Sequence, residues 1–126
     1  MTSRGRAAVE RLAPEPAAAL AEVERAAAAS VDARTLGLVR DRVTSLLGLG
    51  ASELDDWRRS TTLDARDRAL LGFVEQFVFS VSSMADDQVD PLLAQMSPDQ
   101  LHELSNAVWA LDLTARLDHV AGAVLA

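Results

Sequence analysis

The sequence predicts an all-α fold, and three observations support that prediction. The 126 residues include 23 alanines and 19 leucines, which favour helices, and few of the β-branched and aromatic residues that favour strands. No segment alternates apolar and polar side chains as a half-buried strand does. Helix-start signals recur along the chain. A chain of this length forms one domain, so we expect a bundle of six or seven helices over residues 7–126, after a flexible N-terminal tail over residues 1–6.

Prolines and capping residues divide the N-terminal half of the chain. Pro14 interrupts the first apolar stretch, and an alanine-rich helix over residues 15–30 follows it. Asp32 is suited to cap the start of the next helix, which we expect to run to about Leu47. Ser52 and Asp55 form the capping-box pattern of a short helix after it.

The most apolar element is predicted over residues 65–83, with Asp64 as its N-cap. All three phenylalanines of the chain lie in it, and its apolar side chains point in nearly every direction. Such a helix is typical of the centre of a bundle. Asp86 or Asp87 is expected to start a further helix, which Pro91 kinks or delays.

The last helix is predicted over residues 98–124, behind a capping box in which Ser97 is the N-cap and Gln100 the third helical residue. At 100° per residue, one side of this helix is expected to face solvent: Glu103, Ala107, Ala110, Thr114 and Asp118. Two apolar stripes flank the other side. They consist of Leu104, Val108, Leu111 and Ala115, and of Leu113, Leu117, Val120 and Val124. Two stripes predict a helix covered on two sides.

Five polar or amphipathic residues fall between these stripes, in a sector expected to face away from solvent: Ser105, Trp109, Asp112, Arg116 and His119. Asp112 and Arg116 are four residues apart, so they can pair. One interpretation is a structural ion pair that fixes helix register or a subunit interface. The other is a pocket in which Arg116, Trp109 and Ser105 bind an anionic ligand while His119 and Asp112 act as catalytic acid or base.

The absence of cysteine and of lysine excludes several classes of site. Without cysteine the chain holds no disulfide, zinc–thiolate site, iron–sulfur cluster or thiol nucleophile. All twelve basic residues are arginine, which excludes Schiff-base chemistry and a P-loop lysine. His102 and His119 are too far apart on the last helix to share a metal ion. We therefore expect no metal and no cofactor.

The net charge of −7 is unevenly distributed. Residues 1–68 hold eleven arginines and eleven acids, whereas residues 69–126 hold one arginine and eight acids. No clustered basic face is available to bind nucleic acid. No apolar stretch approaches the length of a membrane span, and charged residues interrupt any signal-peptide core near the N-terminus. We expect a cytoplasmic protein that binds neither nucleic acid nor membrane.

Two stretches of the sequence resemble the alkylhydroperoxidase D-like, or carboxymuconolactone decarboxylase, superfamily. One runs from Asp32 to Gly48. The other runs from Trp57 to Leu125 and includes the strings Asp67-Arg68-Ala69-Leu70-Leu71 and Ala110-Leu111-Asp112-Leu113-Thr114-Ala115-Arg116-Leu117. The resemblance implies an all-helical bundle that forms homo-oligomers through its long helices.

The chain departs from the superfamily where its redox residues would stand. Peroxidase members carry Cys-x-x-Cys and a histidine directly after the first stretch, but here Leu47-Gly48 continues into Leu49-Gly50-Ala51-Ser52, and Gly37 occupies the position of an upstream glutamate. A peroxidatic step needs a thiolate, so peroxidase activity is not expected.

Three functional hypotheses follow from this departure. The first is a redox-inactive homo-oligomer that binds a small molecule or assembles with another protein. The second is a cofactor-independent enzyme, of lyase, decarboxylase or isomerase type, that acts on a small acidic molecule. The third is an obligate partner of a catalytic paralogue.

Overall fold

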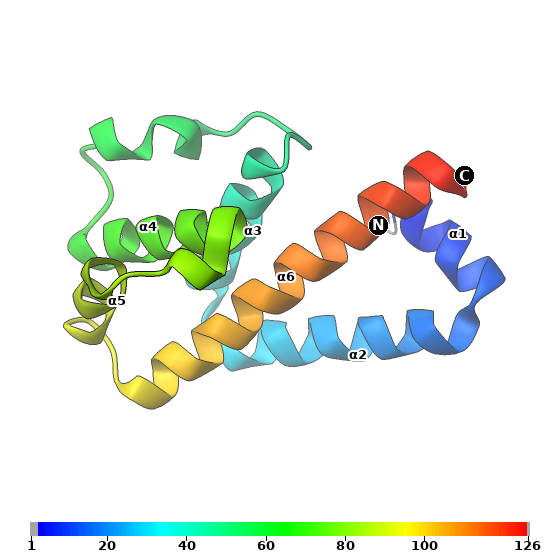
Figure 1. Ribbon diagram of the computed structural model, residues 1–126, viewed down its shortest axis with the longest axis horizontal. Helices are drawn as coiled ribbons and strands as arrows, with labels where there is room; N and C mark the ends of the chain where they lie inside the picture. Colours follow the sequence, from blue (N-terminus) through cyan, green and yellow to red (C-terminus); the bar gives the residue numbers. More distant parts are fainter. Residues whose placement is uncertain (1–2, 126) are drawn as a thin grey trace.

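The computed structural model describes residues 3–125, and the regular structure in that range is helical throughout (Figure 1). The prediction of an all-α fold is confirmed. Six α-helices and two 3-10 helices follow one another along the chain: α1 (Arg4–Leu12), α2 (Pro14–Ser30), α3 (Ala33–Leu46), η1 (Glu53–Arg59), α4 (Ala65–Ser80), η2 (Val81–Ser83), α5 (Asp86–Leu93) and α6 (Pro98–Val124).

The predicted capping residues hold the starts of the helices. Asp32 accepts a hydrogen bond of 2.8 Å from the Thr35 amide at the start of α3. Asp64, Ser52 and Ser97 each form a reciprocal capping box, at the starts of α4, η1 and α6. These side chains accept bonds from amides that have no partner within their own helix, and so they fix where each helix begins.

The predicted tail over residues 1–6 is wrong for the part of it that the structure describes. Ser3 caps α1 by accepting a hydrogen bond of 3.0 Å from the Arg6 amide, and Gly5 and Arg6 are buried. The physical reason is tertiary packing, since Gly5 lets the α1 backbone approach α6 closely near Gly122. Residues 1–2 of the predicted tail lie outside the described residues.

Helix α6 crosses the molecule, with α3, α4 and α5 to one side and α1 and α2 to the other (Figure 1). The main core joins α3, α4, α5 and α6 and consists of Val39, Val43, Leu70, Phe73, Val74, Val78, Leu92, Leu104, Val108 and Leu111. A second, smaller core joins α2 to α6 through Ala27, Ala107 and Ala110. Among the described residues, no helix is both long and apolar enough to cross a membrane.

The orientation predicted for α6 is confirmed for the first apolar stripe, where Leu104, Val108 and Leu111 are buried, but is wrong for the other sides of the helix. Ala107, Ala110 and Thr114, expected on the solvent side, are only 0%, 2% and 4% exposed. Ala107 and Ala110 face α2, whose alanines leave room for a close approach between the two helices. In contrast, Val120 and Val124 of the second predicted stripe are exposed. The physical reason is that small residues, and not only large apolar ones, line the buried side of α6.

Helix α4 is central, as predicted, because each of its residues from Arg66 to Val78 is buried or half-buried. It ends at Ser80 and continues into η2, so the predicted element over residues 65–83 contains two helices. Leu70, Leu71 and Val74 are fully buried, but Phe79 is 70% exposed. An aromatic ring left in solvent at the end of a core helix marks apolar surface that this single chain does not cover.

Candidate functional site

The predicted Asp112–Arg116 pair is present on α6. Arg116 Nε lies 2.8 Å from Asp112 Oδ1, and Arg116 Nη2 donates a hydrogen bond of 3.1 Å to the carbonyl oxygen of Val78. That carbonyl lies in the last turn of α4, where backbone acceptors have no partner within the helix. Arg116 therefore ties the end of α4 to the middle of α6. This arrangement agrees with the structural interpretation of the pair.

The sector of α6 that holds these residues faces outward, contrary to the prediction. Trp109 is 53% exposed, His119 is exposed, and the Arg116 side chain is 49% exposed. The Ser105 hydroxyl donates to the carbonyl of Leu101 in its own helix. The physical reason is that α2 packs against the alanine side of α6, which turns the opposite side to solvent.

The structure places His119 and Trp109 in different grooves. His119 lines a groove of about 480 Å³ that also includes residues from the start of α1, the turn after α3 and the C-terminal part of α6: Ser3, Arg4, Gly5, Leu49, Ala115, Asp118, Gly122 and Ala123. Trp109 borders a separate groove of about 290 Å³ between α2 and α6. Neither groove is lined by Arg116 or Asp112. The five predicted site residues thus do not converge on one pocket.

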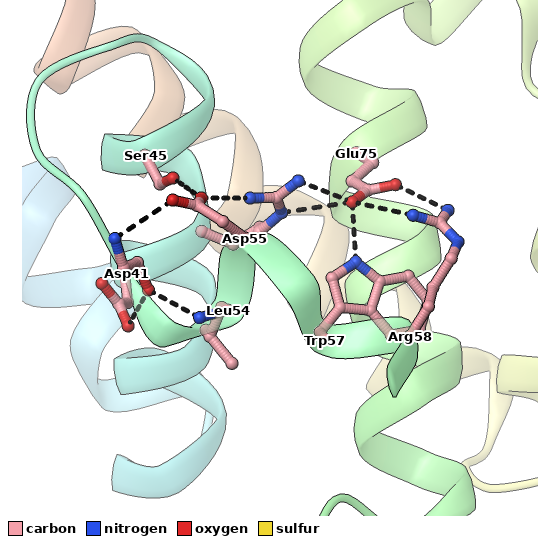
Figure 2. Close-up of polar contacts among 9 residues, drawn as sticks. Asp41, Ser45, Leu54, Asp55, Trp57, Arg58 and Glu75 are labelled. Carbon is pink, nitrogen blue, oxygen red and sulfur yellow. Dashed lines mark hydrogen bonds and ion pairs between the residues drawn. The ribbon is translucent and has the colours of Figure 1, made fainter. Parts of the chain in front are cut away.

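A buried polar network that the sequence analysis missed joins α3, η1 and α4 (Figure 2). Its centre is the Glu75 carboxylate, whose side chain is 12% exposed. Glu75 Oε1 accepts hydrogen bonds of 2.7 Å from Trp57 Nε1 and from Arg42 Nη2. Glu75 Oε2 accepts one of 2.8 Å from Arg58 Nη2. Three side chains, one from α3 and two from η1, therefore donate hydrogen bonds to this carboxylate.

The network continues from Arg42 to the start of η1. Arg42 Nη1 lies 3.0 Å from Asp55 Oδ1, and the Ser45 hydroxyl also donates to that carboxylate. The pKa of Asp55 is lowered, chiefly by the Ser45 hydrogen bond. The Ser52 hydroxyl donates a hydrogen bond of 2.8 Å to the Asp41 carboxylate on α3. Each charge in the network is met by a partner, so the arrangement braces the fold and holds η1 against α3 and α4.

One signal in the sequence could have revealed part of this network. On α3, Arg42 projects from the same side as Thr35, Val39 and Val43, which are all buried. An arginine on the apolar side of a helix needs a buried acidic partner. The sequence does not identify that partner, because Glu75 lies 33 residues away.

The turn after α3 is where the resemblance would place a redox motif. Gly48 has a φ of 74°, and the amides of Gly48 and Leu49 bond back to Ser45 and Thr44 at 3.0 and 2.9 Å. This pattern is a Schellman-type helix end, which favours glycine at the left-handed position. Gly37, at the position of the superfamily's glutamate, is exposed on α3 with open space around it. The turn is therefore a compact helix end made without cysteine.

Comparison with known proteins supports the fold. No protein-family model matches the chain, and no curated protein matches it. A crystal structure of a protein of unknown function from Agrobacterium tumefaciens, a proposed antioxidant defence protein AhpD, superimposes with a TM-score of 0.76 at 23% identity. The alignment covers 85% of this chain and 88% of that one. The two chains share one fold. The predicted alkylhydroperoxidase D-like bundle is confirmed at the level of the fold.

Proposed function

We propose that this chain is a cysteine-free, redox-inactive member of the alkylhydroperoxidase D-like superfamily that acts as an assembly subunit. It associates with copies of itself through the outer face of α6, defined as Trp109, Leu113, Arg116, Leu117, Val120 and Val124. The shared fold and the two stretches of sequence resemblance support the superfamily. The absence of cysteine supports the loss of peroxide chemistry.

The observation that carries the assembly role is the apolar surface of this outer face. Trp109 is 53% exposed, Val120 is 56% exposed and Val124 is 72% exposed, and they recur along one side of a single helix. Nearby, a groove of about 380 Å³ opens between this helix and the α1–α2 corner, and its lining is apolar: Val9, Pro16, Leu20, Leu117, Val120, Ala121, Val124 and Leu125, with Asp118 at its edge. Contiguous apolar surface of this kind is typical of an interaction site.

The enzyme hypothesis receives less support from the structure. It requires Arg116 and His119 to face one substrate, with Asp112 beside them. Arg116 instead binds Asp112 and the end of α4, whereas His119 borders a groove on the side of α1. The catalytic roles of His119 and Asp112 and the ligand-binding roles of Arg116, Trp109 and Ser105 rest on the sequence alone, and we favour assembly.

Substitution of Val120 by aspartate should dissociate the assembly. A carboxylate in the centre of a desolvated apolar contact costs several kcal/mol because it has no partner there. Light scattering coupled to size exclusion should show a multiple of the 13.5 kDa chain for the native protein and a single chain for Val120→Asp. Leu93→Asp is the matched control, because Leu93 is an exposed apolar residue (42%) on α5, away from the outer face of α6. This variant should keep the native mass. A native protein that runs as a single chain would contradict the proposal.

Peroxide chemistry should be absent. The purified protein, mixed with hydrogen peroxide or an organic hydroperoxide and a dithiol reductant, should consume no more peroxide than buffer does, because the chain supplies no thiolate. A peroxide-consumption assay over a range of protein concentrations measures this. Consumption that rises in proportion to protein concentration would refute the redox-inactive assignment while leaving the assembly role open.

A further inference from the structure

The outer face of α6 carries a regular seam. The seam takes four residues of that face together with Asn106 and Ala123. Its six residues are separated alternately by three and four positions: Asn106, Trp109, Leu113, Arg116, Val120 and Ala123. All six are exposed except Leu113, which is half-buried. Alternating spacings of three and four define the contact line of a helix that pairs lengthwise with another helix. The seam spans residues 106–123, about five of the seven or so turns of the 27-residue helix α6, which suits pairing along most of it.

We propose that two copies of the chain pair antiparallel along this seam, in the register that sets Trp109 of each copy opposite Val120 of the other. Asn106 then lies opposite Ala123, and Leu113 opposite Arg116. This inference rests on the proposed assembly role and adds to it the contacting residues and their direction. In an antiparallel pair related by a two-fold axis, each such contact occurs twice.

Size and shape favour this register. Trp109 is the largest side chain on the seam, and in this register it meets Val120, which lines the apolar groove of about 380 Å³ beside Leu20 and Val124. The indole of one copy thereby covers the groove of the other. Large side chains set against small ones fill a helix contact without voids, and a buried tryptophan contributes strongly to an interface.

Charge favours the antiparallel direction. Near the two-fold axis, Arg116 of one copy comes within one position of Asp112 of the other copy, while it keeps its own Asp112 at 2.8 Å. The positive charges of the two arginines and the negative charges of the two aspartates then neutralise one another. A parallel pair would instead set Arg116 against Arg116 in a single layer, and like charges in contact oppose association.

Engineered cysteines test the register directly, because the native chain contains none. The double variant Asn106→Cys/Ala123→Cys keeps Trp109 and Val120. Under mild oxidation it should convert to a covalent dimer, since each cysteine faces its counterpart at disulfide range. Asn106→Cys alone and Ala123→Cys alone should not link. In an antiparallel pair, identical positions at either end lie about 25 Å apart along the helix, at 1.5 Å per residue.

Each other outcome overturns the register. Covalent dimers from either single variant would indicate a parallel pair. Absence of covalent dimer from the double variant, with the native mass retained in light scattering, would refute the register but leave self-association standing. A double variant and a native protein that both run as single chains would refute the register and the assembly role together. Circular dichroism of each variant shows that the helical fold is retained at these exposed positions.

Discussion

Replacement of Gly5 by alanine should destabilise the protein by about 3 kcal/mol, at the upper end of what overpacking costs. A methyl group at this position would overlap the carbonyl oxygen of Asp118 and would lie 2.6 Å from the backbone nitrogen of Gly122. Both are backbone atoms of α6, so no side-chain rotation can relieve the contact. Helix α1 must then move away from α6, which also separates Arg6 from Asp118, now 3.0 Å apart. Urea unfolding measures the loss.

Gly122→Ala is the matched control for this prediction. Its added methyl group would meet Gly5 at 3.6 Å, an ordinary contact, and alanine is favoured over glycine within a helix by up to about 1 kcal/mol. The two glycines face each other, yet the two substitutions should have opposite effects on the free energy of unfolding. If both lower stability equally, the close crossing of α1 and α6 is not what Gly5 provides.

Glu75→Gln should cost about 3 kcal/mol at neutral pH. The substitution keeps the shape of the side chain but removes one of the two carboxylates that pair with Arg42, whose side chain is only 9% exposed. Breaking a buried ion pair at one partner costs about 3–5 kcal/mol. Asp55 remains 3.0 Å from Arg42 in the variant, so we expect a loss at the low end of that range. The amide oxygen of glutamine can still accept hydrogen bonds from Arg42 or Trp57, which limits the loss. Glu103→Gln, at an exposed position on α6, should change stability by less than about 0.5 kcal/mol.

The same variant should also change how stability depends on pH. Burial raises the pKa of Glu75, but hydrogen bonds from Arg58, Trp57 and Arg42 outweigh it and bring the pKa below its ordinary value of 4.5. Glu75 therefore contributes its full stabilisation above pH 4.5 and loses it as the pH falls below 4.5 and through the lowered pKa. The free energy of unfolding of the native protein, measured in urea, should fall as the pH is lowered through that range. In Glu75→Gln the free energy of unfolding should fall less steeply over the same range. Asp67, whose pKa is also lowered, is present in both proteins, so the difference isolates Glu75.

Local signals in the sequence were sufficient to place most of the helices. Asp32, Ser52, Asp64 and Ser97 act on amides two or three residues away, and each predicted cap is present. Their effect depends on the immediate neighbours and not on the rest of the fold. The fold class and the starts of α3, η1, α4 and α6 were therefore predictable.

The candidate site was not predictable to the same degree, because its geometry depends on contacts between distant residues. Which side of α6 is buried depends on whether an alanine-rich α2 packs on Ala107 and Ala110. The Arg42–Glu75 pair joins residues 33 positions apart. Only the Asp112–Arg116 pair, at four residues within one helix, could be predicted, and its surroundings could not.

Helix α6 takes part in both hydrophobic cores, through Leu104, Val108 and Leu111 on one side and Ala107 and Ala110 on the other. It therefore joins the α1–α2 hairpin to the α3–α5 unit. The hairpin packs chiefly on α6, so it can open and close as a local unit while the main core persists. Neither the hairpin nor the α3–α5 unit keeps its packing without α6, because loss of α6 removes the surface on which each of them folds. Any partner that binds α6 thereby stabilises the whole chain.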